Sequence, residues 1–128
     1  MLIDKEAFEV TTYRIDGEYL NNRCPEQVTF VSSLKEDLDR RDFTVNALAY
    51  NHKDGLKDYH NGLEDIKEGT VRAVGKPDLR FNEDALRLIR AVRFSCQLDF
   101  SLSEETFNSI KKNSSLIKNI SRERIREE

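Results

Sequence analysis

Charge recurs along residues 80–94, RFNEDALRLIRAVRF, with a spacing that strongly limits how this segment can fold. One aspartate and three arginines follow one another at intervals of three residues: Asp84, Arg87, Arg90 and Arg93. Apolar residues between them recur with the period of an amphipathic helix. The pattern predicts a long helix over residues 82–97 whose arginines lie on the face away from the core. We expect the core-facing stripe to consist of Ala85, Leu88, Ile89, Val92 and Cys96.

The aspartate and the first arginine of this series carry complementary hydrogen-bonding groups. An ionised carboxylate only accepts hydrogen bonds, and a guanidinium only donates them. Adenine and cytosine present an exocyclic amine beside a ring nitrogen that accepts, whereas guanine and uracil present a carbonyl beside an N–H. Asp84 and Arg87 can therefore pair with adenine and cytosine by the logic that proteins use on base edges. The alternative is an exposed helix on which this pair adds roughly 0.2–0.5 kcal/mol of stability.

The arginine series also suits a long anionic ligand. Successive members rise by about 4.5 Å along a helix, because each residue adds about 1.5 Å. A nucleotide with a base at one end and a triphosphate at the other matches a ladder of this length. We therefore predict a nucleotide-binding face that contains Asp84, Arg87, Arg90 and Arg93.

A second charged segment, RRDFTVNALAY, occupies residues 40–50. Arg40 and Arg41 place positive charge beside a predicted helix start, where free backbone N–H groups already favour phosphate. Asp42 can cap a helix over residues 43–50 or help to hold a metal ion, and capping is the preferred interpretation.

Composition limits the class of protein. The chain has 128 residues, enough for one modest domain or part of a larger one, and a net charge of −3, so any contact with nucleic acid must come from a local patch. The two cysteines show no metal-ligand spacing, and no apolar run is long enough to span a membrane. These features predict a cytoplasmic protein with no membrane partner.

Local signals predict an α+β fold. A β-branched and aromatic run over residues 8–14 indicates a strand, while Ser33, Ser103 and Ser121 each precede a helical pattern as N-caps. We expect the remnant of a mixed sheet, followed by a mostly helical part. Residues 1–60 are predicted to form the end of one domain, and residues 61–128 a helical region.

These segments resemble motifs of the class II tRNA nucleotidyltransferase (CCA-adding enzyme) and bacterial poly(A) polymerase superfamily. Residues 9–17 are similar to its EVTTYR-x-DG strand, and residues 40–50 to its RRDFT-x-NALAY segment. Residues 83–87 match its EDxxR motif, and residues 121–125 resemble the start of its last head-and-neck motif. On this resemblance, the two predicted regions are the end of a nucleotidyltransferase head and a truncated neck that binds nucleotide and RNA.

The resemblance implies a reaction and roles for individual residues. The family adds C, C and A to a tRNA 3′ end without a template, from CTP and ATP with Mg²⁺. The residues expected to contact the incoming nucleotide are Arg41, Asp84, Arg87, Arg90 and Arg93. The residue matching Asp42 is counted among the catalytic acids in the poly(A) polymerase branch.

The chain also departs from the family pattern. A glycine-rich GG-x-VRD turn and a strand bearing DxD are expected before residue 1, and the body and tail that grip tRNA are expected after Glu128. We therefore expect an internal fragment that is inactive alone, because the DxD carboxylates hold the metal ions. The alternatives are a poly(A) polymerase fragment and a non-catalytic nucleotide- or RNA-binding module.

Overall fold

The computed structural model describes residues 2–3, 5–17, 19–20, 24–25 and 27–128. Within these residues the strands pair two by two. The antiparallel pairs are β1 (Leu2–Ile3) with β2 (Glu6–Ala7), β3 (Arg14–Asp16) with β6 (Val28–Phe30), β4 (Tyr19–Leu20) with β5 (Cys24–Pro25), and β7 (Leu48–Asn51) with β8 (Gly55–Asp58). The parallel pair joins β9 (Thr70–Val71) to β10 (Ser101–Leu102).

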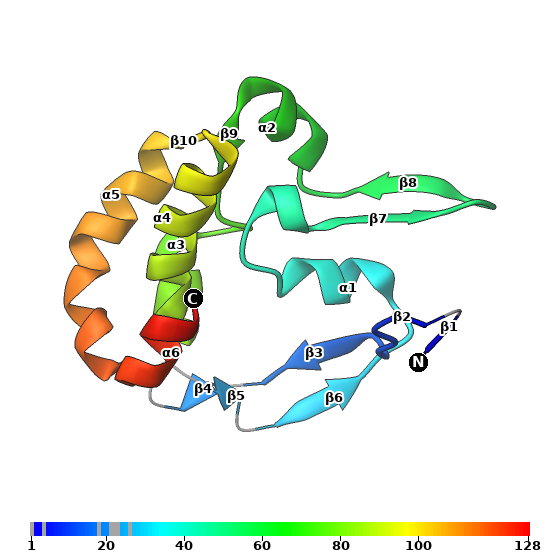
Figure 1. The fold of residues 1–128 in the computed structure, drawn as a ribbon, viewed down its shortest axis with the longest axis horizontal. Coiled ribbons are helices and arrows are strands. Elements are labelled where there is room, and N and C mark those ends of the chain that lie inside the picture. Colours follow the sequence, from blue (N-terminus) through cyan, green and yellow to red (C-terminus); the bar gives the residue numbers. More distant parts are fainter. Residues whose placement is uncertain (1, 4, 18, 21–23, 26) are drawn as a thin grey trace.

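The helices follow mainly in the second half of the chain. They are α1 (Leu34–Asp39), α2 (Gly62–Glu68), α3 (Pro77–Glu83), α4 (Leu86–Leu98), α5 (Glu104–Asn113) and α6 (Arg122–Glu127), with 3₁₀ turns η1 (Thr44–Asn46) and η2 (Ser114–Asn119). Helices α3 to α6 gather on one side, and the β1–β2 and β3–β6 pairs extend away from them on the other (Figure 1). The predicted α+β class is confirmed. None of the described helices combines the length and apolar character needed to cross a membrane.

The predicted serine caps are confirmed. Ser33 Oγ accepts the backbone N–H of Glu36 at the start of α1, and Ser103 and Ser121 do the same at α5 and α6. Each cap satisfies one of the N–H groups that a helix start leaves unpaired. The predicted strand over residues 8–14 is wrong in extent, because β3 begins only at Arg14.

The helix predicted over residues 43–50 is also wrong. Phe43 is extended and bridges to Ala73, η1 makes a single tight turn, and residues 48–51 form β7. Asp42 Oδ1 accepts the N–H of the next residue, Phe43, at 2.8 Å, and the turn η1 has no side-chain cap, so the predicted capping of a helix by Asp42 is wrong. Pairing of β7 with β8 overrides the local helical pattern, as tertiary contacts often do for short apolar segments.

The long helix predicted over residues 82–97 is interrupted. Helix α3 ends at Glu83, Asp84 is extended (φ −135°, ψ 108°), and α4 begins at Leu86. Asp84 Oδ1 accepts the N–H of Leu86 at 3.0 Å, which gives the backbone an alternative to helical hydrogen bonding. The break changes which residues face the core, so that Val92 and Cys96 are exposed while Ala91 is fully buried.

Two apolar clusters hold the helical half together. Phe43 and Ala91 are buried in a cluster that joins α4 to the parallel β9–β10 pair. Ala85, Leu86 and Ile120 form a second cluster, against which Ile125 of α6 packs. The second cluster fixes α6 beside the α3–α4 junction, where the charged residues converge.

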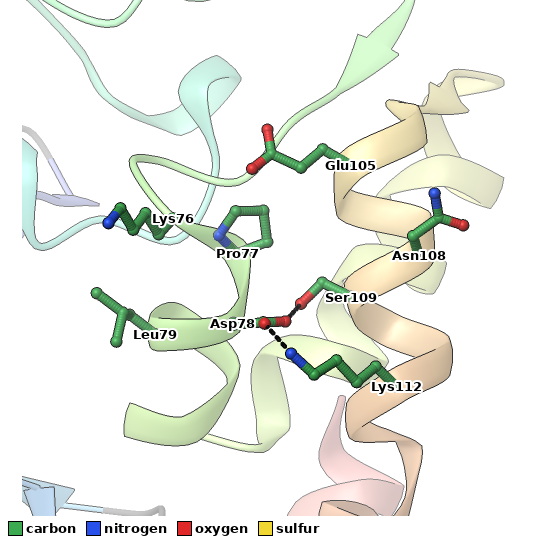
Figure 2. A pocket seen from close by; sticks show the side chains of 8 residues that line it. All are labelled: Lys76, Pro77, Asp78, Leu79, Glu105, Asn108, Ser109 and Lys112. Atoms are coloured by element: carbon green, nitrogen blue, oxygen red, sulfur yellow. Dashed lines mark hydrogen bonds and ion pairs between the residues drawn. The ribbon is translucent and has the colours of Figure 1, made fainter.

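A polar contact joins α3 to α5 at the edge of a pocket (Figure 2). Asp78 accepts hydrogen bonds from Lys112 Nζ at 2.5 Å, from the hydroxyl of Ser109 and from the side-chain amide of Asn113. Lys112 and Ser109 hold the pKa of Asp78 at about 2, below its ordinary value of 3.8. Asp78 and its three partners bond to one another and thereby hold α3 against α5, so we assign these residues a structural role.

Asp78 makes the stability of the α3–α5 contact depend on acid. A carboxyl whose pKa is lowered by folding stabilises the fold above its ordinary pKa, and this contribution is lost as the pH falls through the lowered value. We expect Asp78→Asn to lower the melting temperature near neutral pH, with the difference from the unmodified chain shrinking between about pH 4 and about pH 2. Glu105→Gln, in the same pocket, is the control. A difference that stays constant over this range would contradict the assignment.

Candidate nucleotide-binding site

A pocket of about 380 Å³ lies where the end of α1, the α3–α4 junction and α6 meet. It is lined by Arg14, Arg40, Arg41, Asp42, Asp84, Leu86, Arg87, Arg90 and Arg124. Six arginines face two aspartates, so the pocket is strongly cationic. Clefts lined by one sign of charge concentrate ligands of the opposite sign, which here means anions.

The structure brings together five of the six residues that the sequence singled out. Arg41, Asp42, Asp84, Arg87 and Arg90 all line this pocket. Arg93 does not line it. These residues come from two segments more than 30 positions apart, and the contact of Asp42 with Arg90 joins the segments directly.

Asp84 lies at the break between α3 and α4, with its side chain largely covered. Its carboxylate accepts the N–H of Leu86 at 3.0 Å and Nη2 of Arg124 at 3.1 Å. The acid is therefore held by the start of one helix and by a cation from another. Its orientation is set by α6, an element far from it in the sequence.

Arg87 lies in the first turn of α4, and only 8% of it is exposed. Its guanidinium donates to Glu83 at 2.6 Å and to the backbone carbonyls of Arg80 at 3.0 Å and Arg40 at 3.1 Å. These contacts come from α3, which precedes α4 in the chain, and from the end of α1. We expected Arg87 on a solvent-facing side of a long helix, but the packing of α1 and α3 covers it.

Arg90 connects α4 to the RRDFT segment. Its Nη2 lies 2.7 Å from Oδ2 of Asp42, and its Nη1 lies 3.4 Å from Glu128. Burial opposes the charge on Arg90, but the carboxylates of Asp42 and Glu128 raise the pKa of the guanidinium above its ordinary value. Arg90 therefore stays protonated although it is half-buried.

Arg93 lies one turn further along α4 and faces a different partner. Its Nη2 lies 2.6 Å from Glu128, and its guanidinium carbon lies 4.3 Å from the ring centroid of Phe94. A cation over an aromatic face is attracted by the ring quadrupole. Both interactions hold Arg93 beside the pocket without making it part of the lining.

The arginine doublet is anchored by a carboxylate that sequence reasoning did not select. Asp37 is buried and lies 2.7 Å from Arg40 and 3.0 Å from Arg41. Burial raises the pKa of Asp37, but hydrogen bonds from Arg40 and Arg41 outweigh this effect and lower it. The i,i+3 and i,i+4 spacing of these residues is the signal that could have revealed the anchor.

Arg14, Arg40 and Arg124 also line the pocket but were not among the predicted nucleotide-binding residues. Arg14 comes from β3 and Arg124 from α6, so neither belongs to the two charged segments. No periodic pattern within a single helix could have linked these residues to the site. Their positions depend on how the elements pack.

A metal centre is not supported by the described part of the chain. Among those residues, no three His, Cys, Asp or Glu side chains gather in a way that could hold a metal ion. The two carboxylates of the pocket are each paired with an arginine, Asp42 with Arg90 and Asp84 with Arg124. The residues present therefore do not fit the Mg²⁺ that the resemblance implies, and no chemical step is assigned to it.

Comparisons with known proteins identify the family of the chain. Residues 1–72 match the model of the Poly A polymerase head domain, and residues 99–128 match that of a probable RNA and SrmB-binding site of polymerase A. A CCA-adding enzyme of Lactobacillus helveticus is 53% identical over 128 residues, which are 100% of this chain and 32% of that enzyme.

Solved structures show the same relationship. The crystal structure of the Bacillus stearothermophilus CCA-adding enzyme in complex with CTP has a TM-score of 0.86 and 44% identity, over 95% of this chain and 29% of that one. A tRNA nucleotidyltransferase complexed with a primer tRNA and an incoming ATP analog has a TM-score of 0.67 and 42% identity, over 73% of this chain and 28% of that one.

The fold and the matching family model thus place the chain in the nucleotidyltransferase class. More particularly, it belongs to the Poly A polymerase head domain family, within the superfamily of CCA-adding enzymes and bacterial poly(A) polymerases. The resemblance read from the sequence motifs is confirmed. The chain spans about a third of the length of the curated relatives that it matches.

Proposed function

We propose that this chain binds and selects the incoming nucleotide in a tRNA nucleotidyltransferase that adds C and A to tRNA 3′ ends from CTP and ATP. The observation that carries the proposal is the convergence of Arg41, Asp84, Arg87 and Arg90 on one cationic pocket. The relatives named above as CCA-adding enzymes support the activity, and the complexes with CTP and with a primer tRNA support the partners.

Base choice rests on Asp84 and Arg87. The carboxylate accepts the exocyclic amine of adenine or cytosine, and the guanidinium donates to the neighbouring ring nitrogen. Guanine and uracil would place a carbonyl against the carboxylate and an N–H against the guanidinium. Both mismatches leave polar groups unpaired inside the pocket, which is costly for binding.

Arg41 and Arg90 are assigned to binding the triphosphate. Arg93 lies just beyond the pocket lining and is assigned to the same ligand. Nε of Arg41 is buried and has no hydrogen-bond partner within the described residues. A buried donor without a partner is unfavourable, so Arg41 gains by turning toward an anion. Arg90 and Arg93 already share the carboxylate of Glu128, and phosphate oxygens offer the same kind of acceptor.

The domain assignment and the role of Asp42 remain part of this proposal. Residues 1–60 would be the end of a nucleotidyltransferase head, and residues 61–128 a helical neck that binds nucleotide and RNA. Asp42 is assigned to holding Arg90 rather than to catalysis, because the two are in contact at 2.7 Å. We propose that the chain alone transfers no nucleotide, and incorporation of CMP or AMP into tRNA by the isolated chain would contradict this.

A second candidate is a nucleotide-binding module without activity, which rests on the same cationic pocket. The two candidates share the pocket and differ in catalysis. A fusion of this chain with the remaining parts of a CCA-adding relative distinguishes the two candidates. Only the first candidate predicts that the fusion incorporates nucleotides into tRNA.

Titration of the chain with the four nucleoside triphosphates tests base selection. We expect ATP and CTP to bind more tightly than GTP and UTP by about 1–3 kcal/mol, or roughly 5- to 150-fold, because one well-placed pair discriminates by this amount. Isothermal titration at a fixed salt concentration measures it. Equal affinities for all four nucleotides would refute the assignment of Asp84 and Arg87.

A further inference from the structure

Asp84, the carboxylate assigned to base reading, is held by a residue from a different helix. Nη2 of Arg124, in α6, lies 3.1 Å from Oδ2 and 3.3 Å from Oδ1 of Asp84. Arg124 also lines the same pocket, and its side chain is 23% exposed. The ion pair therefore lies at the edge of the space that a base would occupy.

We propose that Arg124 is a positioning residue for base selection, which it exerts through the carboxylate of Asp84. This inference rests on the proposed function, since it concerns the same pocket. It gives a role in base selection to a residue of α6, which lies outside both the arginine series of α4 and the RRDFT segment. Arg124 would not contact the base; it would fix the plane of the carboxylate that does.

A carboxylate needs such a constraint to discriminate between bases. Its terminal torsion is broad and roughly two-fold, so an unconstrained aspartate presents its oxygens over a wide range of directions. In this structure Leu86 N fixes Oδ1, and Arg124 bridges both oxygens. With both oxygens held, the carboxylate plane has a single orientation.

The arrangement leaves capacity for a ligand. A carboxylate offers about four acceptor sites. Leu86 and Arg124 make three contacts with Asp84 among those described. One further donor can therefore be accepted, and the exocyclic amine of adenine or cytosine supplies one hydrogen in the required direction. A carbonyl from guanine or uracil supplies none.

Helix α6 is itself fixed in position, which makes this constraint effective. Ile125 packs against the cluster of Ala85 and Leu86, and Glu128 is paired with Arg90 and Arg93 of α4. The helix is thus attached to α4 by the apolar contacts of Ile125 and by the ion pairs of Glu128 at its end. Loss of Arg124 alone leaves these other contacts in place.

Nucleotide titrations on variants of the whole chain test the inference. The variants are Arg124→Ala, Arg124→Lys and, as a matched control, Arg126→Ala, which removes an exposed arginine from the same helix. We expect Arg124→Ala to bring the ratio of ATP to GTP affinity down by about fivefold or more, toward one, because the carboxylate loses its fixed orientation. Arg126→Ala should leave the ratio unchanged.

The ratio separates positioning from other roles of Arg124. If the role of Arg124 were purely structural or electrostatic, Arg124→Ala would bind all four nucleotides more weakly by the same factor. The ratio of ATP to GTP affinity would then be unaltered, and this result would overturn the inference. Tighter binding of ATP by Arg124→Ala would also overturn it, because Arg124 would then be competing with the base. If circular dichroism shows that Arg124→Ala does not fold, Arg124→Lys decides, since it keeps the charge but not the planar fork. An unaltered ratio in that variant counts against the inference.

The design also distinguishes this inference from the proposed function. If the unmodified chain does not prefer ATP and CTP, the base-reading role of Asp84 fails, and the inference fails with it. If the unmodified chain shows the preference and Arg124→Ala shows it equally, only the role of Arg124 is refuted.

Discussion

Replacing Arg87 by alanine is expected to abolish the preference for ATP and CTP over GTP and UTP. The guanidinium is the only proposed donor to the ring nitrogen of the base, so the loss should equal the discrimination of one base-edge pair, about 1–3 kcal/mol or roughly 5- to 150-fold. Competition titrations with all four triphosphates measure the change. Binding of GTP and UTP should be affected much less than binding of ATP and CTP.

The same substitution has a structural consequence that must be separated from base choice. Arg87 donates to Glu83 and to the backbone carbonyls of Arg80 and Arg40, and alanine leaves these acceptors without it. Each buried group that loses its partner costs roughly 1–3 kcal/mol. Arg87→Lys keeps the charge and removes the fork, which makes it the milder variant.

Arg122→Ala, which removes an exposed arginine from α6, serves as the matched control for charge. We expect Arg87→Lys to fold and to show a reduced preference, while the control keeps the preference of the unmodified chain. An undiminished ATP and CTP preference in folded Arg87→Lys and Arg87→Ala would refute the role of Arg87.

Phe43→Ala is expected to be the most damaging single change to the fold. Phe43 is fully buried in the cluster with Val71, Ala73 and Ala91, and its ring meets Phe94 edge to face at 5.7 Å. Truncation of a buried phenylalanine costs about 3–5 kcal/mol, through lost burial and the cavity that remains. Because whole domains are stable by only about 5–15 kcal/mol, this is a large fraction.

Urea denaturation followed by circular dichroism measures this loss. Phe30→Ala provides the control, because Phe30 on β6 is 72% exposed. A change there should alter the free energy of unfolding by no more than about 0.5 kcal/mol. If Phe43→Ala costs less than about 1 kcal/mol, the cluster does not form the centre of the fold in solution.

Sequence periodicity predicted the helices that are defined by their own caps. Ser33, Ser103 and Ser121 mark helix starts by accepting backbone N–H groups close to them in the chain. Gly69 ends α2 in the left-handed conformation, a helix end that glycine commonly provides. Such signals are local, so they can be read without knowledge of the rest of the fold.

The failures arose where distant contacts decide the local structure. Residues 48–51 pair with β8, and Phe43 bridges to Ala73, so the expected helix over residues 43–50 is replaced by a turn and a strand. At Asp84 the side chain bonds to Leu86 N and to Arg124, which breaks the expected long helix. Arg124 lies 40 positions away, beyond the reach of any periodic pattern.

The sequence predicted which residues form the candidate site better than it predicted how they are arranged. The arginine spacing in α4 selected Arg87 and Arg90, and both line the pocket. It also placed Arg93 with them, although Arg93 is turned toward Glu128 and Phe94. The anchor at Asp37 is local, at i,i+3 and i,i+4 from Arg40 and Arg41, and its spacing could have revealed it. The contact of Arg124 with Asp84 depends on packing between distant elements, so its role became visible only in three dimensions.

The comparison of ATP with inosine triphosphate tests the central claim most directly. The two share the purine, the ribose and the triphosphate, and they differ only in the amine and ring nitrogen that Asp84 and Arg87 are proposed to read. If a fixed carboxylate and a neighbouring guanidinium mimic a base-pairing partner, ATP binds more tightly by roughly 5- to 150-fold. Equal affinities would mean that the pocket recognises only phosphate, and the account of base selection would be wrong.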